Sequence, residues 1–233
     1  MKYRFILDST DMICVPIIAR NNAEALIKSA KAEALADMIE IRLDVMETFD
    51  LEEIIRAVSK PVMVTYRSKG QGGEGSADYG TRISYLMNAV ETGADFVDVE
   101  FRIPSEFRQE LFQARGASRL IISNHRLNGT PSREKLEGLL RKMAATGADI
   151  VKIVTQAGAP QDNLRVLGLI PLAENLGIKI IAFCMGPMGR ISRIASPLMG
   201  GYLAFASLET GQESASGQIP VREMKKILGI ISS

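Results

Sequence analysis

The chain has 233 residues and a net charge of +1, with 46% hydrophobic and 24% charged residues, a composition typical of globular proteins. The near-zero charge and the lack of a lysine- or arginine-rich block argue against a nucleic-acid-binding protein, and no apolar run reaches transmembrane length. The first ten residues are interrupted by charges and lack a signal-peptide core, so we expect a soluble cytoplasmic protein. Cys14 and Cys184 lie in apolar runs, which favours buried free thiols, with a single disulfide as the alternative.

The first half of the chain alternates β-branched runs with amphipathic stretches. We predict strands at residues 12–19, 37–44, 61–66 and 96–100, and helices at residues 23–34, 51–58, 81–92 and 105–113. Pro16 is an objection to the first strand, because proline removes a ladder hydrogen bond. One face of the second strand carries only charged side chains, Glu40, Arg42 and Asp44, and we expect that face to open into a polar cavity. The glycine-rich stretch 68–75 is expected to be a mobile loop.

The second half continues the same alternation. We predict strands at residues 119–124, 149–155, 179–184 and 203–207, helices that begin at residues 132 and 191, and helices at residues 162–176 and 221–230. Pro171 is expected to kink or interrupt its helix. Eight strands that alternate with eight helical segments predict an α/β fold, a single-domain (β/α)8 TIM barrel over residues 1–233. A doubly wound open sheet is the second choice.

Lys152 stands in the middle of an otherwise apolar strand, between Val151 and Ile153. Burying an ammonium group is costly, and a buried lysine avoids this cost by losing its proton. The resulting neutral amine is a nucleophile that forms Schiff bases with ketones. The alternative is a lysine that extends to the barrel rim or pairs with a carboxylate, and the segment alone favours this alternative.

Active sites of TIM barrels lie at the carboxyl ends of the strands, and there the other candidate residues collect. His125, the only histidine, ends the strand before the Lys152 strand, so we expect the two side chains to be close. Histidine can both take and give a proton near neutral pH, as Schiff-base chemistry requires. Asp98 and Glu100 are expected to order arginines of the pocket. The remaining polar residues predicted at these strand ends are Glu40, Arg42, Asp44, Arg67, Arg190, Arg193, Ser214 and Gln218.

Six short motifs follow one another along the chain: EIRLD at 40–44, TYRS at 65–68 with GGE at 72–74, SNH at 123–125, VKI at 151–153, GRISR at 189–193 and SASGQ at 214–218. Each motif is a weak signal alone. Together and in this order they closely resemble the type I 3-dehydroquinate dehydratase family, from the first predicted strand to the last helix.

The resemblance implies a hydro-lyase of the shikimate pathway that converts 3-dehydroquinate to 3-dehydroshikimate. Lys152 resembles the lysine that forms a Schiff base with the C3 ketone, and this iminium is the electron sink, so no metal or organic cofactor is implied. His125 resembles the general acid/base of a syn elimination. The resemblance assigns substrate contacts to Glu40, Arg67, Arg193, Ser214 and Gln218, with Arg193 on the carboxylate and Arg42 ordering Glu40 and neighbouring acids. Family members are often homodimers, so a homodimer is expected.

Two positions depart from the family pattern. Gln71 replaces an acidic residue, which is expected to alter a hydroxyl contact, and Arg126 replaces an aspartate, which is expected to change the charge around His125. A phosphate loop at 71–75 is disfavoured because the GK[ST] ending is missing, and a single histidine gives no metal-ligand spacing. The alternatives to a dehydratase are a Schiff-base aldolase and a barrel that only binds a ligand.

Overall fold

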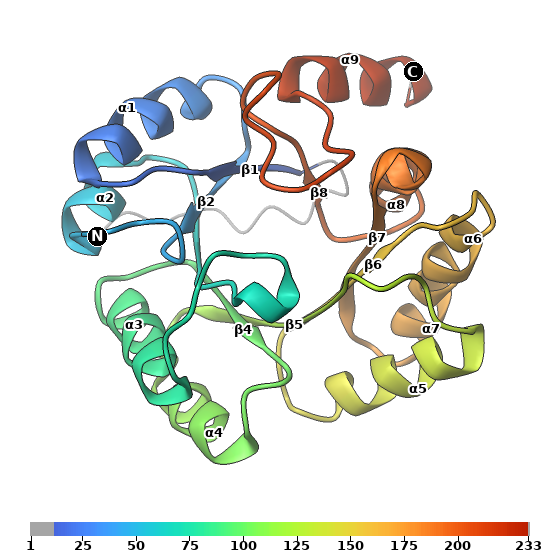
Figure 1. Cartoon of the computed structure of the whole chain (residues 1–233), viewed down its shortest axis with the longest axis horizontal. Helices are drawn as coiled ribbons and strands as arrows, with labels where there is room; N and C mark the ends of the chain where they lie inside the picture. The colour runs from blue at the N-terminus through green and yellow to red at the C-terminus, as the bar shows by residue number, and fades with distance from the viewer. Residues whose placement is uncertain (1–11, 233) are drawn as a thin grey trace.

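The computed structural model describes residues 12–232, and the prediction for the N-terminal ten residues lies outside this range. Eight parallel strands form one sheet in the order β7-β6-β5-β4-β3-β2-β1-β8 and curl into a barrel (Figure 1). The strands are β1 Ile13–Ile17, β2 Met38–Arg42, β3 Val62–Thr65, β4 Phe96–Glu100, β5 Arg119–Arg126, β6 Ile150–Gln156, β7 Lys179–Met185 and β8 Ala204–Phe205. The predicted (β/α)8 barrel is therefore confirmed.

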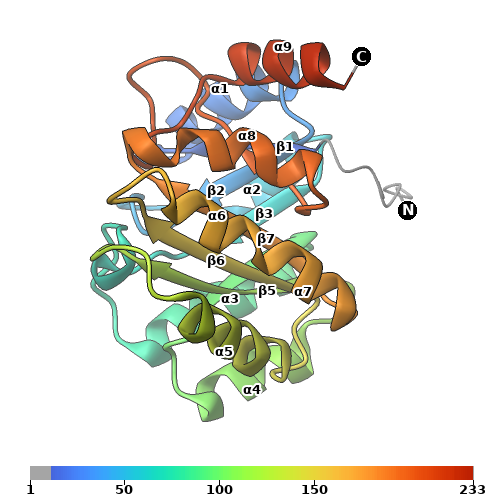
Figure 2. The ribbon, with the colours of Figure 1, turned by 90° about the vertical axis from the view of Figure 1, so that its right-hand side faces the viewer.

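Helices surround the barrel on its outside, as Figures 1 and 2 show. They are α1 Asn22–Glu33, α2 Leu51–Ala57, α3 Tyr79–Glu91, α4 Ser105–Ala114, α5 Arg133–Ala144, α6 Asp162–Leu167, α7 Leu169–Asn175, α8 Arg190–Leu198 and α9 Val221–Ile231, with short 3-10 turns η1 Lys69–Gln71 and η2 Pro187–Gly189. The predicted helix 162–176 is divided at Gly168. Pro171 accounts for the division, because a proline ring clashes with the carbonyl four residues earlier, here that of Leu167.

The barrel closes between β7 and the short strand β8. The backbone N–H of Tyr202, just before β8, donates to the carbonyl of Ile180 in β7 at 2.7 Å. On its other side β8 pairs with β1, where Phe205 is in register with Cys14. This closure rules out the open doubly wound sheet, and it brings the ends of all eight strands around one axis.

The interior of the barrel has an apolar end and a charged end. Apolar side chains such as Met38, Met63, Phe96 and Ile121 pack inside the amino-terminal half, whereas a second and larger apolar cluster lies between strands and helices. The side chains of the second strand confirm the predicted alternation: Ile41 belongs to the outer cluster, and the charged face lies inside. Inward-facing charges thus gather at the carboxyl ends of the strands.

Cys14 and Cys184 are both buried and free, as expected. Within residues 12–232 no helix is long and apolar enough to cross a membrane.

Candidate active site

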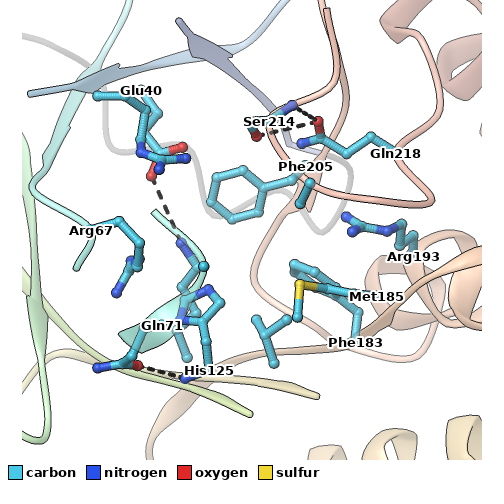
Figure 3. Close-up of a pocket in the computed structure, with 15 residues that line it drawn as sticks. Glu40, Arg67, Gln71, His125, Phe183, Met185, Arg193, Phe205, Ser214 and Gln218 are labelled. Carbon is cyan, nitrogen blue, oxygen red and sulfur yellow. Dashed lines mark hydrogen bonds and ion pairs between the residues drawn. The ribbon is translucent and has the colours of Figure 1, made fainter. Parts of the chain in front are cut away.

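A cavity opens at the carboxyl ends of the strands, and all eight residues predicted for catalysis or substrate binding line it (Figure 3). They come from strands β2, β5 and β6 and from segments that follow β3, β7 and β8. The full lining is Glu40, Arg42, Arg67, Gln71, Gly72, His125, Lys152, Val154, Phe183, Met185, Arg193, Phe205, Ser214, Ala215 and Gln218. Positions 178 residues apart in sequence therefore face one space because the sheet closes.

The Lys152 amine points into this cavity and is buried, with only 4% of the residue exposed. Its Nζ lies 3.0 Å from Asp98 Oδ2 and 3.8 Å from Glu40 Oε1. This is the geometry of an ion pair, so the amine does not lie in the purely apolar surroundings that the sequence predicts. The carboxylates are what allow a charged amine to remain buried.

Asp98 on β4 joins the lysine to a buried polar network. Its Oδ2 also pairs with Arg67 Nη2 at 2.7 Å, and its Oδ1 accepts a 2.5 Å hydrogen bond from the Ser123 hydroxyl. Burial alone would raise the pKa of Asp98, but the cations of Arg67 and Lys152 outweigh burial and hold this pKa well below its usual range. Asp98 is therefore a fixed negative charge, and the prediction that it orders a pocket arginine is confirmed.

His125 lies near the end of β5, two residues beyond Ser123, which is in register with Lys152 on β6. Removal from water, together with the cations of Arg67 and Lys152, lowers the pKa of His125 well below its usual value. Its Nδ1 is buried and has no hydrogen-bond partner among the residues that the structure describes. The imidazole is therefore neutral near pH 7 and able to accept a proton.

Gln71 forms a hydrogen bond with the backbone of His125, the candidate catalytic histidine. β4 ends at Glu100, in register with Ser123, so beyond Ser123 the edge of β5 that faces β4 has no strand beside it. The side-chain oxygen of Gln71 fills this gap by accepting the His125 N–H at 2.7 Å (Figure 3). The sequence flagged Gln71 as a departure from a family pattern but gave no sign of this contact. Arg126, the other departure, is exposed and is not among the main charges that shift the pKa of His125.

Arg42 orders a neighbouring acid, as expected, but this acid is Asp44 and not Glu40. Its Nε and Nη2 donate to the two oxygens of Asp44 at 2.8 Å each, whereas Glu40 accepts from the Thr65 hydroxyl at 2.7 Å. Asp44 in turn accepts the backbone N–H groups of Arg67 and Glu74. Arg42 and Asp44 therefore anchor the segment after β3.

Arg193 on α8 is a buried cation with no carboxylate partner in the described chain. Its Nη2 donates to the Ser216 carbonyl at 3.1 Å, and its guanidinium carbon lies 4.5 Å from the centroid of the Phe183 ring. Burial lowers the pKa of Arg193 to about 10. Its Nε is buried without a hydrogen-bond partner in the same described part of the chain. A free, desolvated guanidinium fork of this kind suits an anionic ligand group.

The loop between β8 and α9 lines one side of the cavity. Gln218 Oε1 accepts from the backbone N–H of Ser214 at 2.7 Å and from its hydroxyl at 3.2 Å. The loop also rests on the segment after β7, because Gly186 N–H donates to the Ser216 carbonyl at 3.0 Å. These polar groups of the loop therefore satisfy one another.

No cluster of three or more histidine, cysteine or acidic side chains suited to a metal ion occurs in residues 12–232.

The fold and the site together define an α/β barrel in which a buried amine, a neutral imidazole and a guanidinium without a carboxylate partner surround one cavity. The family model described as type I 3-dehydroquinase matches residues 13–233. The chain belongs to the type I 3-dehydroquinase family.

Proteins from several organisms are similar to this chain. The chain is 36% identical to the 3-dehydroquinate dehydratase of Pyrococcus abyssi, over 94% of this chain and 98% of that protein. It is 37% identical to the bifunctional 3-dehydroquinate dehydratase/shikimate dehydrogenase of Arabidopsis thaliana, over 94% of this chain but only 37% of that longer protein. The type I 3-dehydroquinate dehydratase of Clostridium difficile, solved with covalently modified comenic acid, superposes with a TM-score of 0.87 at 28% identity, covering 96% of this chain and 93% of that one.

Proposed function

We propose that the chain is a 3-dehydroquinate dehydratase that acts through a Schiff base on Lys152, with His125 as general acid and base. The observation that carries the proposal is a buried amine on β6 that shares a cavity with an imidazole held neutral on β5. Family membership supports the overall reaction, a hydro-lyase step in the biosynthesis of aromatic amino acids. The covalently modified compound in the Clostridium difficile enzyme supports covalent chemistry in this family.

The reaction begins with a proton transfer, because the resting amine is paired with Asp98. Asp98, whose pKa is held well below its usual range, is a poor acceptor. His125 becomes the better acceptor, directly or through a water molecule, because the Lys152 cation that helps to lower its pKa disappears as the proton is transferred. The free amine then attacks the C3 carbonyl. The hydroxyl of the resulting carbinolamine leaves as water with the proton that His125 took from Lys152, which gives a protonated imine and makes His125 neutral again.

The protonated imine draws electrons away from C2, so His125 can remove the C2 proton and form an enamine. The enamine expels the C1 hydroxyl, which leaves as water with the proton that His125 carries. Water then hydrolyses the product imine, releases 3-dehydroshikimate and restores the lysine. The water lost in imine formation is regained in this hydrolysis, so the net reaction releases one water.

The other lining residues bind and enclose the substrate in this proposal. Arg193, the cation without a carboxylate partner, takes the substrate carboxylate. Glu40 and Arg67 contact ring hydroxyls, while Arg42 acts through Asp44 on the segment that carries Arg67. Ser214 and Gln218 exchange their mutual hydrogen bonds for contacts to the substrate when the β8–α9 loop closes.

The test is to mix the purified chain with 3-dehydroquinate and follow the absorbance of the conjugated enone product. The wild type should produce it, Lys152→Met should not, and His125→Asn should be slower by a factor of about 100 or more. Circular dichroism verifies that both variants fold. Cleavage of a C–C bond would instead indicate an aldolase, and tight binding without turnover would indicate a ligand-binding module.

A further inference from the structure

The Phe205 side chain forms one wall of the candidate active site. It is the second residue of the two-residue strand β8 and is only 4% exposed. Figure 3 shows its ring projecting into the cavity between Glu40 and Arg193. The Lys152 Nζ lies 4.2 Å from the centroid of this ring. The ring is therefore in contact with the nitrogen atom on which the proposed chemistry takes place.

An aromatic face attracts a cation through its quadrupole, and the attraction is stronger where water is excluded. The Lys152 nitrogen has two kinds of neighbour, the carboxylates of Asp98 and Glu40 and the ring of Phe205. A carboxylate both attracts a protonated nitrogen and can accept its proton. A benzene ring attracts the same cation but has no site that accepts a proton.

We propose that Phe205 is a further catalytic residue, whose ring keeps positive charge on the Lys152 nitrogen once this nitrogen is bonded to the substrate carbon. This inference rests on the proposed Schiff-base function. The protonated imine is the electron sink of the reaction, and an unprotonated imine accepts electrons poorly. During removal of the C2 proton, the C2–H electron pair forms the C2–C3 double bond and the C3–N π pair moves onto nitrogen. The ring forms and breaks no bond in this step.

The ring acts against a background of other charges around the nitrogen. Asp98 faces it from β4 and Glu40 from β2, and the guanidinium group of Arg67 and the titratable imidazole of His125 lie in the same buried network. A test must therefore change the ring's electrostatics while the shape of the site stays constant. Stepwise fluorination of the ring does this, because fluorine withdraws electrons from the π face and changes the volume little.

The experiment replaces Phe205 with mono-, di- and trifluorophenylalanine in the full chain and measures kcat with 3-dehydroquinate as a function of pH. We expect the alkaline limb of the profile to move to lower pH with each fluorine, by about one pH unit for the trifluoro variant. Borohydride trapping of the Lys152 adduct should show the same shift. The same series at Phe96, which packs in the apolar end of the barrel, is the control and should leave the profile unchanged.

Phe205→Leu, which keeps an apolar side chain without a π face, should show the trifluoro shift or a larger one. A profile that stays fixed across the fluorinated series, with the Lys152 adduct still formed, would overturn the role of Phe205 alone. A wild-type chain that gives no adduct would instead overturn the Schiff-base function, so the two failures are distinguishable.

Discussion

His125 illustrates how single residues set the chemistry of this site. Desolvation and the cations of Arg67 and Lys152 depress its pKa below the ordinary value of 6.5. A base with a depressed pKa stays unprotonated, and hence active, until the pH falls below that lower value. We therefore predict that the acid limb of the kcat/KM profile lies clearly below pH 6.5, as measured by initial rates in buffers of constant ionic strength. An acid limb at or above pH 6.5 would contradict this account of the electrostatics.

Asp98 is the residue on which the buried charges most depend. Its replacement in Asp98→Asn keeps the shape but leaves the Arg67 and Lys152 cations with less compensation. Breaking a buried pair in this way costs about 3 kcal/mol of unfolding free energy or more. Urea denaturation measures this loss. Glu47→Gln, which breaks the exposed 3.1 Å pair with Arg20, is the control and should cost less than about 1 kcal/mol. Equal unfolding free energies for the two variants would refute the claim that Asp98 stabilises the buried charges.

At the scale of elements, the segment after β3 is held in a fixed conformation by close packing of glycine. A Cβ at Gly73 would lie 2.2 Å from the Arg67 carbonyl oxygen, whereas a Cβ at Gly70 would meet nothing within 4 Å. Gly73→Ala must therefore displace Gln71 and the His125 backbone that it holds. We expect kcat/KM to fall on the order of 100-fold, against no more than about twofold for Gly70→Ala. Similar kcat/KM values for both variants would show that catalysis does not require this packing.

The β8–α9 loop allows a second matched comparison. Gly211 and Gly217 both have positive φ, +84° and +83°, so alanine costs about 1–2 kcal/mol of backbone strain at either site. Only at Gly217 does a Cβ collide with backbone, 2.4 Å from the Gly186 carbonyl oxygen. Gly217→Ala should raise KM on the order of tenfold because the loop can no longer close. Steady-state kinetics measure KM for both variants. If Gly217→Ala has the same KM as the reference variant Gly211→Ala, closure of the loop does not involve this contact.

Local patterns predicted the elements well but could not predict the contacts between them. Strand limits followed from alternation and β-branched runs, and the inward face of β2 followed from its charges. Pro171 predicted an interruption of the helix at 162–176, and the observed break between α6 and α7 lies at Gly168, three residues earlier. The pairs Arg42–Asp44 and Gln71–His125 depend on how the segment after β3 folds back, which residue type alone does not specify. Glycines there permit close packing, and the predicted mobility of this loop stays a prediction.

On the scale of the whole molecule, closure of the barrel makes a charged end that is nearly balanced. Within residues 12–232, and apart from Asp162, which pairs with Arg165 on α6, four carboxylates and four cations are buried there: Glu40, Asp44, Asp98, Glu100, Arg42, Arg67, Lys152 and Arg193. Of the four cations, only Arg193 has no ion-pair partner in that range, so the site is suited to one added negative charge. A homodimer, a cytoplasmic location and a single domain over residues 1–233 stay predictions.

The central claim is that the Lys152 amine bonds covalently to its substrate inside this barrel. Borohydride reduction during turnover with 3-dehydroquinate, followed by peptide mass spectrometry, tests it most directly. The account predicts a stable adduct on Lys152 in the wild type and in His125→Asn, and none in Lys152→Met. Product formation by the wild type without any adduct on Lys152, or an adduct on another lysine, would contradict the account.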